Sequence, residues 1–218
     1  MSASESHPKK WLIAYNSISS SLWSIILFNT VFLGTFLGQP ILFDKTNKIL
    51  TIVQTCAVVE IFNAAFGYVR SPLFTTIVQV FSRLLIVYGI CQFLPDSPAN
   101  SHWCYITLGL SWSITEIIRY SYYALSLTGP GKVPHYLTWA RYSFFLVLYP
   151  TGVSSELLMI YLSLDEATSK VGAWYSLLLK IIMATYIPGF YMLYTYMLKQ
   201  RKKILGKKVE PSSTKKTD

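Results

Sequence analysis

Tyr149 and Glu156 are the residues of this chain whose types and spacing best fit a reaction. They bound the run Tyr149-Pro150-Thr151-Gly152-Val153-Ser154-Ser155-Glu156, which lies inside a long apolar segment. On an ideal helix a separation of seven residues is about 700° of rotation, so both side chains project in nearly the same direction. Gly152 falls on the same face between them and is expected to leave room for a small reacting group. A tyrosine and a carboxyl group are the acid and the base that proton transfer needs.

Glu156 has no lysine or arginine one helical turn away in its own segment. A carboxyl group buried without a cation suits a group that exchanges a proton near neutral pH. Pro150 removes one helix hydrogen bond and clashes with the carbonyl group of Leu146, so a kink is expected beside Tyr149. Taken alone, Tyr149 is more simply read as a packing residue, because the chain has 16 tyrosines. The kink, the glycine and the lone acid together favour a site.

The composition predicts the kind of molecule that must hold these residues. Of the 218 residues, 52% are hydrophobic and only 13% are charged, whereas soluble domains carry about 25% charged residues. Repeated apolar runs of about 20 residues indicate an all-α polytopic membrane protein, a six-helix transmembrane bundle. We expect no second domain and no internal repeat. The predicted spans are residues 11–37, 49–69, 73–94, 103–127, 135–164 and 173–198, preceded by an arm (1–10) and followed by a basic tail (199–218).

The distribution of basic residues predicts the orientation of the chain. The net charge is +9, and lysine and arginine crowd the tail and alternate loops. Because basic flanks stay in the cytosol, both termini are expected there. The tail ends Lys215-Lys216-Thr217-Asp218, which resembles the dilysine retrieval signal of endoplasmic reticulum membrane proteins. The excess of positive charge is attributed to topology and anionic lipid rather than to nucleic acid.

Seven ionisable side chains fall within the predicted spans, and each costs roughly 3 kcal/mol at the bilayer centre. They are Glu60, Arg83, Glu116, Arg119, Arg141, Glu156 and Lys180. Salt bridges of Glu116 with Arg119, or of Glu60 with Arg83, would offset this cost, and contacts to an anionic substrate are the alternative. Gln79 lies one turn before Arg83, and Tyr120 follows Arg119. Arg141 and Lys180 lie near span ends and can extend to the interface instead.

Several kinds of site are excluded by the sequence. Cys56, Cys91 and Cys104 are isolated, and none is followed by an arginine at the spacing of the phosphatase loop C-x5-R. The three histidines are scattered, so histidine-rich di-iron chemistry is excluded. No glycine-rich phosphate loop follows a strand. We therefore expect no metal and no cofactor.

Several runs of the chain are similar to one known family. Tyr149 to Glu156 resembles the signature of the very-long-chain (3R)-3-hydroxyacyl-CoA dehydratases, also called protein tyrosine phosphatase-like proteins. The other matching runs are Trp112-Ser113-Ile114-Thr115-Glu116-Ile117-Ile118-Arg119-Tyr120, Val69-Arg70-Ser71-Pro72 and Tyr186-Ile187-Pro188-Gly189-Phe190. The resemblance covers about residues 15 to 203 and looks closest to the fungal members.

This resemblance implies a six-span enzyme of the endoplasmic reticulum membrane. It would convert (3R)-3-hydroxyacyl-CoA to trans-2-enoyl-CoA, the third step of fatty-acid elongation, and so supply chains for sphingolipids. The family's catalytic pair falls on Tyr149 and Glu156, and which of the two takes the alpha proton is left open. CoA is part of the substrate, and an elongase and the ketoacyl and enoyl reductases are the expected partners. The residues expected to bind substrate or support the site are Glu60, Gln79, Arg83, Glu116, Arg119, Tyr120, Arg141 and Gly152.

Two other functions remain open on the sequence. The first is a non-catalytic membrane scaffold of the elongation complex, in which the intramembrane polar groups only join helices. The second is a transporter, which the buried charges suggest but the missing repeat weakens.

Overall fold

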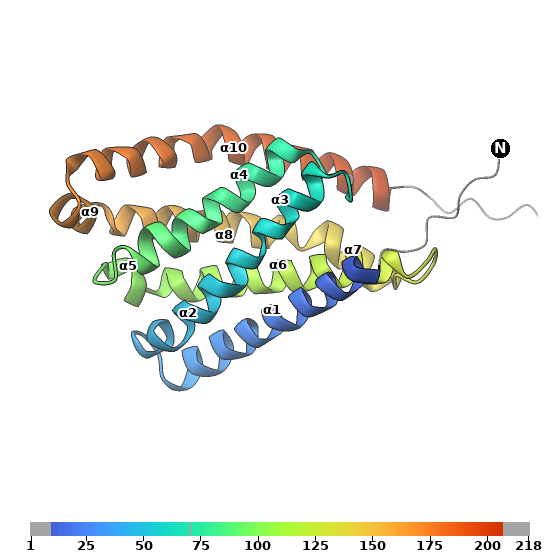
Figure 1. Cartoon of the computed structure of the whole chain (residues 1–218), viewed down its shortest axis with the longest axis horizontal. Coiled ribbons are helices and arrows are strands. Elements are labelled where there is room, and N and C mark those ends of the chain that lie inside the picture. The colour runs from blue at the N-terminus through green and yellow to red at the C-terminus, as the bar shows by residue number, and fades with distance from the viewer. Residues whose placement is uncertain (1–9, 70, 207–218) are drawn as a thin grey trace, which may run out of the picture.

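The computed structural model describes residues 10–69 and 71–206, and within these residues every regular element is helical (Figure 1). The all-α prediction is confirmed. The elements are α1 (Lys10–Phe36), α2 (Ile41–Cys56), α3 (Val58–Ala65), α4 (Leu73–Leu84), the π-helix η1 (Leu85–Gln92), α5 (Pro98–Ser101), α6 (Trp103–Leu127), α7 (His135–Ser143), α8 (Phe145–Leu162), α9 (Leu164–Lys170) and α10 (Ala173–Leu205).

Five helical segments of the described chain are long and apolar enough to cross a bilayer, which makes this a multi-pass membrane protein. They are Lys10–Phe36, Ile41–Ala65, Leu73–Gln92, Phe145–Lys170 and Ala173–Leu205. The remaining predicted span, 103–127, forms α6 over its whole length but is not among the five. Glu116, Arg119 and several serines and tyrosines lower its mean hydropathy. A helix can carry such residues when it is surrounded by other helices, and α6 packs against α1, α5, α7 and α8.

The predicted start of the second span, residue 49, is wrong, because α2 already begins at Ile41. Asp44, Lys45 and Lys48 interrupt the apolar run but are exposed on one side of α2. Leu42 and Phe43 are buried on the other side. The charges therefore end the apolar stretch without ending the helix.

The last two predicted spans also differ from the helices. Residues 135–164 were expected as one segment, but they divide into α7 and α8 at Phe144, upstream of Pro150, and α9 begins at Leu164. Helix α10 runs on to Leu205, so the first residues of the predicted tail are helical. The predicted retrieval signal, most of the N-terminal arm and Arg70 lie outside the described residues.

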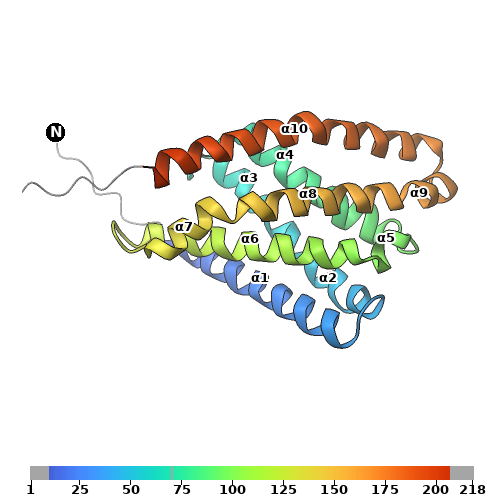
Figure 2. The same cartoon turned by 180° about the vertical axis from the view of Figure 1, so that it is seen from behind.

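The start of α1 and the end of α10 lie at the same end of the molecule (Figures 1 and 2), hereafter the terminal end. The bundle is packed most tightly at the opposite end. Helix α10 buries only Tyr175, Ser176 and Leu179, all in its first two turns. The residues of α8 that are buried lie in its later turns, from Gly152 to Ile160. Towards the terminal end α10 is therefore loosely held.

Candidate active site

Four charged side chains form a chain of ion pairs across three helices. Arg119 of α6 donates to both carboxylate oxygens of Glu60 on α3, at 2.7 and 2.6 Å, and to Glu116 at 2.8 and 2.5 Å. Arg83 of α4 donates to the other oxygen of Glu116. The side chain of Glu116 is only 2% exposed. Charges of alternating sign offset the desolvation that each would otherwise suffer.

The pairing agrees only in part with the sequence-based alternatives. The expected salt bridge of Glu116 with Arg119 is present, but Glu60 pairs with Arg119 rather than with Arg83. Tyr120 donates to Glu60. The guanidinium carbon of Arg119 lies 4.3 Å from the centre of the Tyr120 ring. Arg119 therefore uses four of its five N–H donors on the carboxylates of Glu60 and Glu116.

Glu156 lies outside this ion-pair chain and is held by two uncharged donors. It is 7% exposed. Its Oε1 accepts from the indole Nε1 of Trp112 on α6 at 2.9 Å, and its Oε2 accepts from the hydroxyl of Tyr186 on α10 at 2.8 Å. No salt bridge of the described chain includes Glu156. The carboxyl group is thus fixed in orientation without forming an ion pair.

Arg83 joins the ion-pair chain to the surroundings of Glu156. Its guanidinium lies 5.4 Å from the centre of the Trp112 ring, and it is close enough to Glu156 and to Tyr149 to interact electrostatically with both. Glu116 is its only hydrogen-bond partner among residues 10–69 and 71–206. Because a guanidinium has five N–H donors, Arg83 retains donors for an anionic oxygen.

Tyr149 is placed by aromatic stacking rather than by a hydrogen bond. Its ring stacks on Phe190 at a centroid distance of 5.3 Å and on Tyr194 at 6.3 Å, both on α10. Tyr186, Phe190 and Tyr194 follow one another at one-turn intervals along α10. One face of α10 thus meets both Glu156 and Tyr149. In the described part of the chain the Tyr149 hydroxyl has no hydrogen-bond partner, which leaves it available to a ligand.

Three of the predicted supporting residues are placed differently from the expectation. A side chain at Gly152 would meet Cβ of Ser111 at 3.6 Å and Cδ1 of Trp112 at 4.0 Å, so Gly152 lies where α8 faces α6. Gln79 is exposed, whereas Arg83 one turn later is partly buried. Arg141 of α7 donates to the Tyr123 hydroxyl at 3.0 Å, and α7 lies at the terminal end (Figure 1).

Trp112 and Tyr186 are the site residues that the sequence reasoning missed. Both stand in runs that carry the family resemblance, Trp112 one turn before Glu116 and Tyr186 two residues before Pro188. Their place in these runs was the feature of the sequence that could have identified them as site residues. Their bonds to Glu156 join residues 44 and 30 positions apart, which no local pattern reveals.

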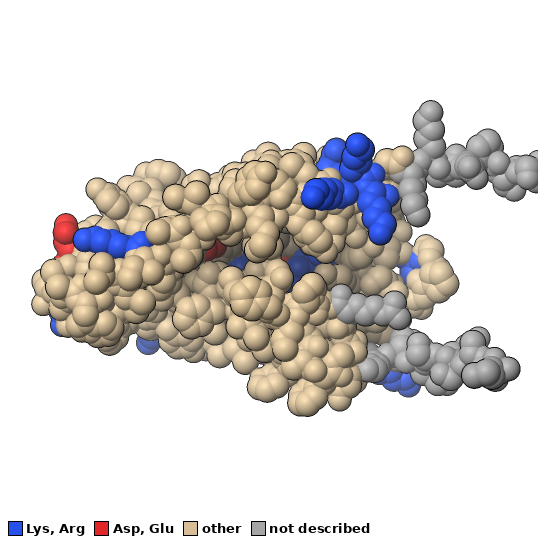
Figure 3. All heavy atoms as spheres, turned by 90° about the horizontal axis from the view of Figure 1, so that it is seen from above, with Lys and Arg blue, Asp and Glu red and all other residues tan. Residues whose placement is uncertain are grey.

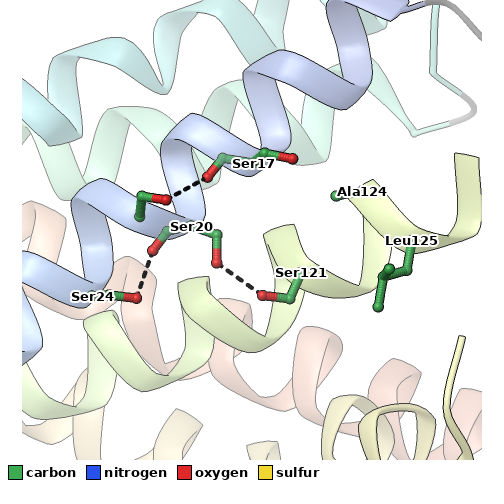
Figure 4. Close-up of a pocket in the computed structure, with 7 residues that line it drawn as sticks. Ser17, Ser20, Ser24, Ser121, Ala124 and Leu125 are labelled. Carbon is green, nitrogen blue, oxygen red and sulfur yellow. Dashed lines mark hydrogen bonds between the residues drawn. The ribbon is translucent and has the colours of Figure 1, made fainter. Parts of the chain in front are cut away.

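A second polar hollow lies between α1 and α6 (Figure 4) and is lined by Ser17, Ser20, Ser21, Ser24, Ser121, Ala124 and Leu125. The hydroxyls of Ser20 on α1 and Ser121 on α6 bond each other at 2.8 Å, and Ser24 donates to the carbonyl oxygen of Ser20 at 2.8 Å. None of the predicted site residues lines it. The hydrogen bond between Ser20 and Ser121 connects α1 with α6. The hollow is separate from the site of Glu156.

Comparisons with known proteins agree with the family resemblance. The family model described as "Protein tyrosine phosphatase-like protein" matches residues 54–207. The chain is 42% identical over 200 residues to the "Probable very-long-chain (3R)-3-hydroxyacyl-CoA dehydratase" of Schizosaccharomyces pombe, covering 89% of this chain and 92% of that protein. It is 41% identical over 211 residues to "Very-long-chain (3R)-3-hydroxyacyl-CoA dehydratase hpo-8" of Caenorhabditis elegans, covering 90% and 94%.

A plant relative matches over a similar length. The chain is 37% identical to "Very-long-chain (3R)-3-hydroxyacyl-CoA dehydratase PASTICCINO 2" of Arabidopsis thaliana, covering 90% of this chain and 93% of the relative. No solved structure matches the chain significantly.

Proposed function

This chain belongs to the protein tyrosine phosphatase-like family, whose similar members are named very-long-chain (3R)-3-hydroxyacyl-CoA dehydratases, and we propose that it catalyses that dehydration. The observation that carries the proposal is the position of the Glu156 carboxyl group. It is buried, it is oriented by hydrogen bonds from Trp112 and Tyr186, and it lies on the same helix as Tyr149. A scaffold needs neither a fixed carboxyl group nor a tyrosine hydroxyl without a protein partner. The product is trans-2-enoyl-CoA.

We assign the base to Glu156. Both of its oxygens accept hydrogen bonds, and the indole N–H of Trp112 can only donate. Such an arrangement favours the carboxylate form, which can take the proton from C2 of the acyl chain.

We assign the acid to Tyr149, whose hydroxyl keeps its proton at neutral pH when its surroundings do not perturb it. As the C3–O bond breaks, the leaving hydroxyl takes the proton of Tyr149 and departs as water, while the C2–H electron pair forms the double bond. Glu156 then holds the C2 proton and Tyr149 is a tyrosinate. Return of that proton to Tyr149 restores both groups and closes the cycle.

Arg83 is the cation that suits the negative charge developing on the thioester oxygen. Glu116 holds it in place, its remaining N–H donors have no partner in the described residues, and it lies within electrostatic range of both catalytic groups. Donors fixed before the reaction stabilise such charge at little reorganisation cost. Glu60, Glu116, Arg119 and Tyr120 support Arg83 through the ion-pair chain.

The cellular setting is part of the same proposal. Helix α6 has 25 residues, about 38 Å of rise, and lies beside α1 and α8 in both ribbon views (Figures 1 and 2). We count it as a further span, which gives six spans and both termini in the cytosol. We place the protein in the endoplasmic reticulum membrane at the third step of elongation, next to the elongase and the two reductases.

The test is dehydration of a long-chain (3R)-3-hydroxyacyl-CoA by the purified protein in detergent. We expect activity in the wild type and a loss of about 100-fold or more in Tyr149→Phe and in Glu156→Gln. Thermal unfolding checks that both variants remain folded. An inactive wild type, or full activity in both variants, would contradict the proposal.

A further inference from the structure

The basic residues of the terminal end form a cluster that the proposed reaction does not use. Within the described residues it consists of Lys10, Lys132, Arg141, Lys199, Arg201, Lys202 and Lys203. Figure 3 shows a blue group of lysine and arginine side chains near one end of the molecule, and red carboxylates at the other. The salt bridges of the described chain lie elsewhere, on Arg83, Arg119 and Lys170. Among residues 10–69 and 71–206 this positive surface therefore has no carboxylate partner in a salt bridge.

Arg141 and Arg201 are the members of this cluster that protein contacts hold in place. Arg141 Nη2 donates to the hydroxyl of Tyr123, and its guanidinium lies 5.2 Å from the centre of that ring. Its Nε is buried and has no hydrogen-bond partner among the described residues. Arg201 Nε donates to the hydroxyl of Ser143 on α7 at 3.4 Å. Both guanidinium groups retain N–H donors for an anion.

A row of side chains connects this cluster with the catalytic pair. Tyr186, Phe190, Tyr194 and Arg201 project from one face of α10, within about 80° of one another on an ideal helix. Tyr186 bonds Glu156, Phe190 and Tyr194 stack with Tyr149, and Arg201 contacts α7. From Tyr186 to Arg201 the helix rises about 22 Å. Figure 3 shows a hollow in the face formed by α4 and α10, with charged atoms visible at its floor.

We propose that Arg141 and Arg201 bind the phosphate groups of the CoA part of the substrate, and that the pantetheine arm lies along the aromatic row of α10. This inference rests on the proposed function, which requires an acyl thioester at Glu156. Guanidinium groups match phosphate oxygens in charge and in geometry. An arm extended along the row brings the thioester from the charged end to Arg83 and Tyr149. The loosely packed terminal ends of α8 and α10 give the arm its entrance.

The same phosphate chemistry is offered by the head groups of anionic lipids. The two sources are distinguished by comparing a (3R)-3-hydroxyacyl-CoA with the corresponding N-acetylcysteamine thioester, which keeps the thioester and the cysteamine unit but lacks the rest of the pantetheine arm and every phosphate. The assay uses the full-length protein in a neutral detergent without added lipid. The variants are Arg201→Gln, Arg141→Gln and the charge-retaining Arg201→Lys, and the control is Lys45→Gln, which removes an exposed lysine at the other end of the molecule.

We expect Arg201→Gln and Arg141→Gln each to raise KM for the CoA thioester about tenfold, the usual effect of losing one charge-assisted hydrogen bond. Neither should change KM for the N-acetylcysteamine thioester, and Arg201→Lys should recover part of the loss. Lys45→Gln should affect neither substrate. Equal effects on both thioesters, or no effect on either, would overturn the proposal. The cluster would then bind anionic lipid or set the orientation of the chain in the membrane.

Binding separates this inference from the proposed reaction. A saturated acyl-CoA without the 3-hydroxyl group cannot be dehydrated, and its affinity is measured by calorimetric titration against the same variants. Weaker binding in Arg201→Gln, with unchanged binding in Lys45→Gln, would support the phosphate site even if the wild type showed no turnover. Absence of turnover would contradict only the proposed reaction. Binding that does not depend on Arg141 or Arg201 would overturn the site whether or not the protein is a dehydratase.

Discussion

The orientation of the Glu156 carboxyl group depends on the two side chains that donate hydrogen bonds to it. Trp112 and Tyr186 come from different helices, so the carboxyl group is oriented only when α6, α8 and α10 are assembled. Groups that hold a catalytic residue in its productive orientation often matter nearly as much as that residue. We therefore regard Trp112 and Tyr186 as positioning residues.

Trp112→Phe should lower kcat about 10-fold to 100-fold, because a hydrogen bond to a charged group contributes about 1.5–3 kcal/mol. Phenylalanine keeps an aromatic ring beneath Arg83, so KM and the unfolding temperature should change little. Steady-state kinetics and thermal unfolding check both parts. Trp103→Phe, an exposed tryptophan on the same helix, is the matched control. A fall in activity that only follows lost stability would show that Trp112 merely packs.

Gly152→Ala should leave activity close to that of the wild type. A methyl group there would meet Ser111 and Trp112 at ordinary van der Waals distances, and alanine is about 1 kcal/mol more favourable than glycine within a helix. Dehydration kinetics together with thermal unfolding test this. Loss of activity in a stable variant would mean that the substrate needs the space above Gly152, as the sequence alone suggested.

At the residue scale, side-chain type and spacing predicted that Tyr149 and Glu156 share one helix, and both lie on α8. Their catalytic roles stay a prediction. Type and spacing were not enough for Trp112 or Tyr186, because those contacts depend on which helices become neighbours. The role expected for Gly152 depends on the same neighbours, because a glycine leaves a gap only where no other helix packs over it, and α6 lies within van der Waals distance here. That role stays a prediction.

Among the elements, α6 carries two of the four members of the ion-pair chain, Glu116 and Arg119. Glu116 on this helix accepts from Arg83 of α4 and Arg119 of its own helix, and Arg119 in turn reaches Glu60 of α3. The ion-pair chain thus fixes the register of three elements through one carboxyl group.

Glu116→Gln should lower the free energy of unfolding by about 3–5 kcal/mol, because it leaves two arginines in the bundle with too little negative charge. The unfolding temperature in detergent reports this loss. Asp96→Asn is the control, since the Asp96 side chain is 88% exposed and lies 3.9 Å from Lys170, where an ion pair contributes about 1 kcal/mol at most. Equal stability of both variants would contradict a structural role of the chain.

The positions of most helices followed from hydropathy, but the start of α2, the break between α7 and α8, the end of α10 and the pairing of the buried charges did not. The early start of α2 was missed because Asp44, Lys45 and Lys48 interrupt the apolar run without interrupting the helix. The pairing of Glu60 with Arg119 rather than Arg83 was missed because sequence spacing does not tell which face of α3 meets α6. Apolar content therefore located the helices, and their neighbours could be read only from the structure.

For the whole molecule, the number of membrane crossings decides where the termini lie. Helix α6 is less apolar than the five candidate spans, yet it lies beside α1 and α8 in the bundle. We count it as a crossing because its polar residues, Glu116 among them, are turned into the protein.

Tags placed at the two ends of the chain should lie on the same side of a sealed microsome. An even number of crossings leaves both tags open to added protease on the cytosolic face, whereas five crossings would protect one of them. Immunoblotting with and without detergent distinguishes the two cases. Protection of a single tag would contradict both the sixth span and the cytosolic entrance for CoA.

The division of labour between Glu156 and Tyr149 is tested most directly by changing the leaving group. Fluoride leaves carbon with far less need of a proton than hydroxide does, so elimination from a (3R)-3-fluoroacyl-CoA needs the base and much less of the acid. We expect Glu156→Gln to lose elimination from both substrates. Tyr149→Phe should lose dehydration of the hydroxyacyl-CoA but keep most of the fluoride release. Loss of both reactions in Tyr149→Phe, with fluoride release retained in Glu156→Gln, would contradict the assignment.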